Sequence, residues 1–191
     1  DVHDRTAERV FGTNSGLDPK ELRRRAKIIN YALLYGKTAF TLAKDIGVPQ
    51  AAAQDFIHAY FSGYPSVRGY IDKTLADARA SGIVRTITGR RRLVPELKSS
   101  NGMIRASAER ETVNMPIQGT AADIRKRAMI DVAAALQARG GQSRMILTVH
   151  DELLFEAADA EAEEVAALVR THMEAAFQLS VPLTVDVGIG R

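Results

Sequence analysis

The segment RRRAKIINYALLYG contains four side chains whose types and spacing could bind a nucleotide. They recur at every fourth position, as Arg23, Lys27, Tyr31 and Tyr35. Because four residues carry an α-helix roughly 40° past one full turn, these side chains fall in one stripe of a helix. The cations could bind phosphate oxygens, and the phenol rings could pack on a sugar or a base. A solvated cationic helix face is the alternative, but it does not explain why the rings continue the line.

A second candidate site is the string TVHDE at residues 148–152. It lies between two segments rich in strand-forming residues, so we predict a hairpin with His150, Asp151 and Glu152 at its tip. Carboxylate oxygens are ligands that Mg²⁺ prefers, usually together with water and substrate phosphates. A polar turn without function is the alternative, since Asp is common in turns.

A third set of side chains surrounds the string NMPIQGTAAD and again recurs every fourth residue: Arg110, Asn114 and Gln118. All three are long hydrogen-bond donors. The minor groove of DNA offers acceptors at similar places in every base pair, so such donors can test pair shape without reading sequence. The alternative is local, because Asn114 and Gln118 flank Pro116, where helix ends need hydrogen-bond partners.

Three basic clusters indicate an anionic partner more strongly than the net charge of +3 does. They are the arginines 23–25, the arginines 90–92, and Arg125-Lys126-Arg127. Arginine clusters are commonly solvated surface, but three of them, two beside candidate motifs, favour nucleic acid.

The composition excludes several classes of protein. The chain has 191 residues, 46% of them apolar and 26% charged, which is typical of a globular protein able to bury a sizeable core. Cysteine is absent, which excludes disulfides and thiolate metal sites. No apolar stretch is long enough to cross a bilayer and no signal-peptide pattern opens the chain, so we expect a cytoplasmic protein without a membrane partner.

The pattern of apolar residues and turn signals predicts an α+β fold. Asp18 and Pro19 open a helix that Gly36 ends, and further helices are predicted over 38–46, 49–61 and 65–80. We therefore assign residues 1–80 to a helical subdomain.

Residues 81–191 are predicted to form an antiparallel sheet with helices packed on one face. The expected strands are 83–87, 91–95, 145–149, 152–156 and 183–189. The expected helices are 103–113, 119–138 and 160–177, the first two separated by Asn114-Met115-Pro116.

The order of these strings resembles the polymerase domain of family A DNA polymerases. The resemblance spans nearly the whole chain and also includes DVHDRTAERVFG, TGRRRLVPEL and VPLTVDVGIG. It implies that residues 1–80 are the fingers subdomain and 81–191 a partial palm. It further implies a DNA-directed DNA polymerase that adds a deoxynucleotide from dNTP to a primer 3′-hydroxyl with two Mg²⁺ ions, in DNA replication or repair.

The resemblance also implies roles for individual residues. Arg23 and Lys27 would hold the triphosphate, with Lys27 also counted as catalytic, while Tyr31 would lie on the sugar and base and Tyr35 beside the template base. Asp151 would be a catalytic metal ligand supported by Glu152. The expected contacts with primer–template DNA are His150, Arg110, Asn114, Gln118, Arg90 and Arg92.

Two departures from the family pattern bear on function. Tyrosine at position 31, where many members carry phenylalanine, implies weak discrimination against dideoxynucleotides. The family's other metal-binding aspartate lies in an Asp-Tyr-Ser-x-Ile-Glu-Leu-Arg segment that this chain lacks. We therefore expect a fragment whose partners include the first palm strand and the thumb of the parent polymerase, and which does not extend a primer alone.

Two other functions remain open at this point. The chain could be a DNA-binding module without catalysis, which the missing aspartate favours. Metal-dependent hydrolysis at His150-Asp151-Glu152 is a weaker alternative, since it leaves the stripe on the first long helix unexplained.

Overall fold

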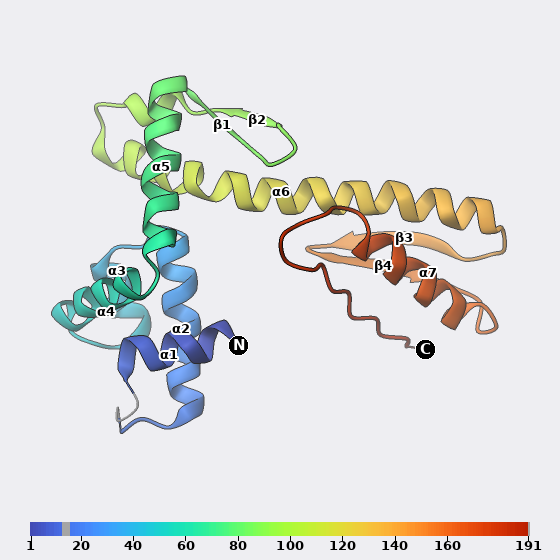
Figure 1. Ribbon diagram of the computed structural model, residues 1–191, viewed down its shortest axis with the longest axis horizontal. Coiled ribbons are helices and arrows are strands. Elements are labelled where there is room, and N and C mark those ends of the chain that lie inside the picture. Colours follow the sequence, from blue (N-terminus) through green and yellow to red (C-terminus); the bar gives the residue numbers. More distant parts are fainter. Residues whose placement is uncertain (13–15, 191) are drawn as a thin grey trace. The chain divides into compact units, whose positions relative to one another are not determined.

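The computed structural model describes residues 1–12 and 16–190 and has the predicted α+β composition (Figure 1). Its contacts divide the chain into two units, Asp1–Gln118 and Gly119–Arg191. Unit 1 contains the whole predicted fingers segment, and the assignment of 1–80 and 81–191 to fingers and palm stays a prediction. Among the described residues, no helix combines the length and apolarity needed to cross a bilayer.

Unit 1 begins with five helices whose bounds agree with the predicted ones to within two residues wherever a helix was predicted. They are α1 (Val2–Phe11), α2 (Pro19–Leu34), α3 (Ala39–Ile46), α4 (Gln50–Gly63) and α5 (Pro65–Ser81). Helix α2 starts where the sequence indicated, because the Asp18 carboxylate accepts hydrogen bonds from the backbone N–H of Lys20 (3.0 Å) and Glu21 (3.3 Å). Its buried residues Ile29 and Leu33 pack in a core with α3 and α4.

The predicted first hairpin forms, but its strands are short. Strands β1 (Ile83–Arg85) and β2 (Arg91–Leu93) pair antiparallel with Ile83 opposite Leu93. The 3₁₀ helix η1 (Pro95–Lys98) follows. A second core beneath this hairpin contains Ala78, Val84, Val94, Leu97 and Ala108.

The two helices predicted around Pro116 are one helix, α6 (Gly102–Arg139), so that prediction was wrong. Pro116 lies inside α6 and has no N–H to donate to the Thr112 carbonyl. The neighbouring Val113 carbonyl accepts a hydrogen bond from the Tyr70 hydroxyl of α5 (3.1 Å). Thr112 and Val113 are both buried, so tertiary packing keeps the chain helical through a residue that would end an isolated helix.

Unit 2 packs a hairpin on two helices. Strands β3 (Arg144–Val149) and β4 (Glu152–Glu156) pair antiparallel, and α7 (Ala162–Glu174) follows. Phe155 of β4 packs against a core of Val132, Leu136, Val165 and Val169, supplied by α6 and α7. The predicted helix 160–177 is therefore present in shortened form.

The predicted strand 183–189 is absent, which corrects the sequence prediction. Leu183, Val185 and Val187 are half-buried and alternate with exposed residues, which is the strand pattern the sequence suggested. However, residues 182–190 are in no helix or strand. A strand exists only where its backbone pairs with another, and side-chain alternation does not supply that partner.

We predict that Tyr70→Phe lowers the free energy of unfolding by about 1 kcal/mol, because it removes the hydrogen bonds of the hydroxyl to the Val113 carbonyl and to Thr74 and keeps the ring. Urea denaturation followed by circular dichroism would measure the change. Tyr35→Phe, which removes an exposed hydroxyl, serves as the control and should leave stability unaltered. Equal stability of the Tyr70 variant and the unsubstituted chain would contradict the proposed bridge.

The outer face of the β3–β4 hairpin leads to a second prediction. Its exposed side chains Ile146, Leu147, Val149 and Leu154 form an apolar surface beside unpaired strand edges. We expect the isolated chain to self-associate at micromolar concentration, and Leu147→Lys to reduce this. Light scattering would measure it, with Ile130→Lys, at an exposed apolar position of α6, as the control. A monodisperse monomer of the unsubstituted chain would refute the prediction.

Candidate functional site

Helix α2 displays the four predicted nucleotide-binding side chains on its exposed side. Arg23, Lys27, Tyr31 and Tyr35 are all exposed, whereas Ala26, Ile29 and Leu33 are buried. The rings of Tyr31 and Tyr35 are stacked, with centroids 6.2 Å apart and planes at 7°. They remain 47% and 38% exposed, so a flat ligand can reach the stack. We refer to these four residues as the α2 stripe.

Neighbouring carboxylates distinguish the arginines at the start of α2. Arg23 forms ion pairs with Asp1, the N-cap residue of α1, and with Asp4 of its first turn, the latter at 3.3 Å. The side-chain hydrogen bonds of Arg24 and then Arg25 lower the pKa of Glu21 to about 2. Arg24 and Arg25 therefore pair with a carboxylate within α2, whereas Arg23 belongs to the stripe and pairs outside the helix. Among the described residues, Lys27 has no carboxylate partner.

The structure adds a residue that the sequence reasoning missed. His3 of α1 lies beside the α2 stripe, with its ring centroid 6.0 Å from that of Tyr31. Burial lowers the pKa of His3, and the charges of Arg23 and Lys27 lower it further. No spacing rule within α2 identifies His3, because its position depends on how α1 packs on α2.

The predicted DNA-contacting helix reaches the end of the α2 stripe. Gly36, directly after Tyr35, has a φ of 69°, and a Cβ built there would lie 2.9 Å from Cγ of Arg110. The aliphatic part of Arg110 therefore packs on the backbone that ends the stripe. Arg110 and Gln118 are exposed on α6 and Asn114 is half-buried. Unit 1 thus brings Arg110, from the third set of predicted residues, to the end of the first.

One arginine of the first hairpin is anchored to α6, and another closes the hairpin loop. Arg92 forms an ion pair with Glu111, the residue after Arg110. The Arg90 carbonyl accepts from the Thr86 N–H (3.0 Å) and closes the hairpin loop. Both arginines are exposed.

Asp151 lies at the tip of the β3–β4 hairpin, as predicted. Val149 pairs with Glu152, which leaves a two-residue turn of His150 and Asp151. His150 has a φ of 53°, the one non-glycine residue with positive φ in the part of the chain that the structure describes. This conformation costs an L-residue about 1–2 kcal/mol, and such strain is typical of functional turns. A bulge at Ile146, which has no partner on β4, lies close to the same turn.

The carboxylates of Asp151 and Glu152 fit part of a magnesium site. Both are exposed and can offer oxygen ligands from the turn. However, nowhere in 1–12 and 16–190 do three or more acidic, histidine or cysteine side chains gather as a metal site would require. The turn therefore supplies only part of a site.

Known proteins resemble this chain along its whole length. The model of the family "DNA polymerase family A" matches residues 1–191. The chain belongs to this family. It is 50% identical over 190 residues to DNA polymerase I of Deinococcus radiodurans, and 47% identical over 192 residues to a thermostable DNA polymerase I of Thermus thermophilus. In both comparisons all of this chain is covered.

The chain spans about a fifth of the length of these relatives, 20% and 23% respectively. A solved structure described as the POL domain of Pol1 from M. smegmatis, in complex with DNA primer-template and dNTP, is also similar. It matches with a TM-score of 0.92 and 45% identity, over 100% of this chain and 34% of that one. This similarity supports the α+β fold of a family A polymerase domain.

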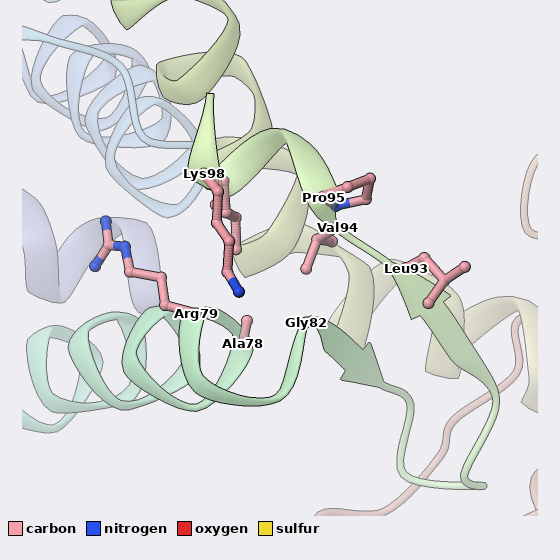
Figure 2. A pocket seen from close by; sticks show the side chains of 8 residues that line it. Ala78, Arg79, Gly82, Leu93, Val94, Pro95 and Lys98 are labelled. Carbon is pink, nitrogen blue, oxygen red and sulfur yellow. The ribbon is translucent and has the colours of Figure 1, made fainter. Parts of the chain in front are cut away.

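A depression elsewhere in unit 1 contains none of the predicted site residues. It has a volume of about 260 Å³ and lies where the end of α5 meets β2 and η1 (Figure 2). Its lining is apolar apart from Arg79 and Lys98. Arg79 is paired with Glu109 at 2.6 Å. The depression offers no pair of catalytic groups, so the α2 stripe remains the better candidate site of this family A chain.

We predict that Gly36→Ala destabilises the chain more than Gly47→Ala does. Both glycines have φ near 68°, so both variants bear the same strain of about 1–2 kcal/mol. Only the new methyl at position 36 meets Arg110, since nothing lies within 4 Å at position 47.

Urea denaturation of the single variants and of Gly36→Ala combined with Arg110→Ala would test this contact. The Arg110 truncation should recover the excess cost at position 36. Additive effects in the double variant would mean that Arg110 does not pack on Gly36.

Proposed function

We propose that this chain is the nucleotide-binding and part of the catalytic region of a DNA-directed DNA polymerase. The reaction joins the primer 3′-oxygen to the α-phosphorus of a dNTP, with loss of the hydroxyl proton and release of pyrophosphate. The observation that carries the proposal is the exposed α2 stripe with Arg110 packed at its end. Family membership and the likeness to a polymerase domain solved with primer-template and dNTP support it. Its setting would be DNA replication or repair in the cytoplasm.

The α2 stripe would bind the incoming nucleotide lengthwise. Arg23 and Lys27 would bind the phosphates, and Lys27 would also offset the charge that develops on the leaving pyrophosphate. Arg23 would exchange its carboxylate partners, Asp1 and Asp4, for phosphate oxygens. The stacked rings of Tyr31 and Tyr35 would meet the sugar, the base and the template base. With tyrosine rather than phenylalanine at position 31, weak discrimination against dideoxynucleotides is part of the proposal.

Donors on α6 and the two hairpins would bind primer–template DNA. Arg110, Asn114 and Gln118 recur every fourth residue on α6 and would contact the newest base pairs through the minor groove. Arg90 and Arg92 would contact the phosphate backbone, and His150 would lie near the primer end.

Asp151 would bind catalytic Mg²⁺, with Glu152 as a supporting carboxylate. Two Mg²⁺ ions activate the primer hydroxyl and neutralise the phosphates when they are bound. The chain's contribution is a carboxylate held on a strained two-residue turn. Since the described residues gather too few ligands, the remaining ones would come from the rest of a polymerase, including its first palm strand, with the thumb as a further partner.

It follows that the isolated chain should bind DNA without extending a primer. This is the binding-module function, and it is favoured for the chain alone by the absence of a complete ligand set among the described residues. Hydrolysis at His150-Asp151-Glu152 is disfavoured for the same reason. A primer-extension assay with Mg²⁺ would decide, and templated synthesis by the isolated chain would refute this expectation.

A chimera tests the catalytic proposal directly. Residues 1–191 would replace the matched segment of Deinococcus radiodurans DNA polymerase I, which is 50% identical. We expect Mg²⁺-dependent templated extension by the chimera. Asp151→Ala should lower kcat by about a thousandfold or more with little loss of primer–template affinity, because it removes a metal ligand and no DNA contact.

Asp159→Ala, at another exposed aspartate beyond β4, is the matched control and should retain the rate of the chimera. Near-normal turnover of the Asp151 variant would rule out its assignment as a metal ligand.

A further inference from the structure

A buried chain of hydrogen bonds connects α5 with the edge of the α2 stripe. The Tyr64 hydroxyl, at the start of α5, lies 3.1 Å from Oγ1 of Thr6. Thr6 Oγ1 lies 3.0 Å from Oδ1 of Asn30, and Nδ2 of Asn30 lies 2.9 Å from Nδ1 of His3. Thr6 is 0% exposed and Asn30 is 5% exposed. We call Tyr64, Thr6 and Asn30 the α1–α2 relay.

The polarity of this relay follows from what each atom can donate. The Thr6 hydroxyl shares its one proton between two acceptors, the Val2 carbonyl (2.9 Å) and Asn30 Oδ1 (3.0 Å). The Tyr64 hydroxyl can then donate to Thr6. An amide nitrogen has protons but no available lone pair, so Asn30 Nδ2 donates and His3 Nδ1 accepts. In the neutral imidazole the single ring proton is then on Nε2.

We propose that the α1–α2 relay is a positioning device that holds His3 as the neutral imidazole with its proton on Nε2. Its consequence for nucleotide binding rests on the function proposed above. The His3 ring stands beside Tyr31, so a fixed Nε2–H provides a donor of constant charge at the stripe. In a protonated ring, Nδ1 of His3 would also carry a proton. This N–H would point at Nδ2 of Asn30, which is itself a donor and cannot accept it.

The net effect of burial and of the charges around His3 also favours the neutral ring. Arg23 and Lys27 of α2 oppose protonation, and Asp4 of α1 favours it. Asp1, the N-cap residue of α1, also lies nearby and pairs with Arg23. Burial is the largest cause, and with the charges of Arg23 and Lys27 it lowers the pKa of His3 below 6.5.

The sign of the resulting pH dependence follows from this lowered pKa. The folded state disfavours the protonated ring, so the contribution of His3 to stability is complete above pH 6.5. It is lost as the pH falls from 6.5 through the lower pKa of the folded state.

Nitrogen NMR of the four histidines in the unsubstituted chain tests the proposal without any substitution. We expect His3 to show a protonated Nε2, an unprotonated Nδ1 and a pKa below 6.5. A proton on Nδ1 of neutral His3 would overturn the proposal, since Asn30 would then be turned the other way.

Asn30→Asp reverses the relay at its contact with His3. A carboxylate accepts from Nδ1–H, so the proton should move to Nδ1 and the proton affinity of His3 should rise at least about tenfold. Gln54→Glu is the matched control, because Gln54 Nε2 lies 3.2 Å from Nε2 of the exposed His58. It should leave His3 unaltered. An unaltered His3 in folded Asn30→Asp would also overturn the proposal.

Tyr64→Phe keeps the ring packed against Tyr60, 5.0 Å away, and removes only the distal hydroxyl. Because Thr6 loses a donor, we expect a measurable fraction of His3 with its proton on Nδ1. Tyr70→Phe, which also removes a hydroxyl from α5, is the control and should leave His3 unaltered. Identical His3 spectra of Tyr64→Phe and the unsubstituted chain would limit the device to Asn30 and refute its extension to Tyr64.

The chimera supplies a readout that a purely structural role would not alter. The KM for dNTP should show no His3 titration between pH 6.5 and 8 in the unsubstituted chimera. In Asn30→Asp it should rise with pH as the ring loses its proton beside a carboxylate. A KM independent of pH in both, with the NMR result as expected, would mean that the relay exists but His3 does not face the nucleotide. If the chimera does not polymerise at all, the function fails while the NMR test of the relay stands.

Discussion

Helix α2 has one side that is buried in the core and another that is exposed, and this constraint organises unit 1. Ile29 and Leu33 are buried in the core with α3 and α4, whereas the residues of the α2 stripe are exposed. The period of the helix allows both, because the two sets of residues project from different sides. The anchored side fixes the position of the free side, so the packing of the core sets the geometry of the candidate site.

The buried polar residue in α2 extends this arrangement. Asn30 is adjacent to Ile29 in the core and to Tyr31 in the stripe, and it bonds to both His3 and Thr6 of α1. A buried amide is stable only when its donors and acceptors are paired, so this network also selects one packing of α1 on α2. That packing brings Asp1 and Asp4 to Arg23. At the cationic end of the stripe, Arg23 is therefore paired with two carboxylates, and Lys27 is paired with none among the described residues.

The candidate catalytic turn in unit 2 is defined by its backbone conformation rather than by helix packing. The β3–β4 hairpin is closed by two residues, and this forces His150 into a conformation that L-residues disfavour. Leu153 and Phe155 of β4 are half-buried, and Phe155 anchors the hairpin by packing against the α6–α7 core. The next residue of the turn, Asp151, is exposed, and its carboxylate is the metal ligand of the proposed function.

The sequence alone determined what depends on local periodicity. The bounds of α2, the grouping of its four stripe residues and the turn at His150-Asp151 follow from the spacing of side chains and from the residues that begin and end each element. Tertiary structure decided the rest. Pro116 remains helical because Thr112 and Val113 are buried, and residues 183–189 form no strand because they have no backbone partner. Likewise His3 reaches Tyr31, and Arg110 reaches Gly36, only through the packing of separate helices. Such contacts join residues that are far apart in the chain, and no local pattern encodes them.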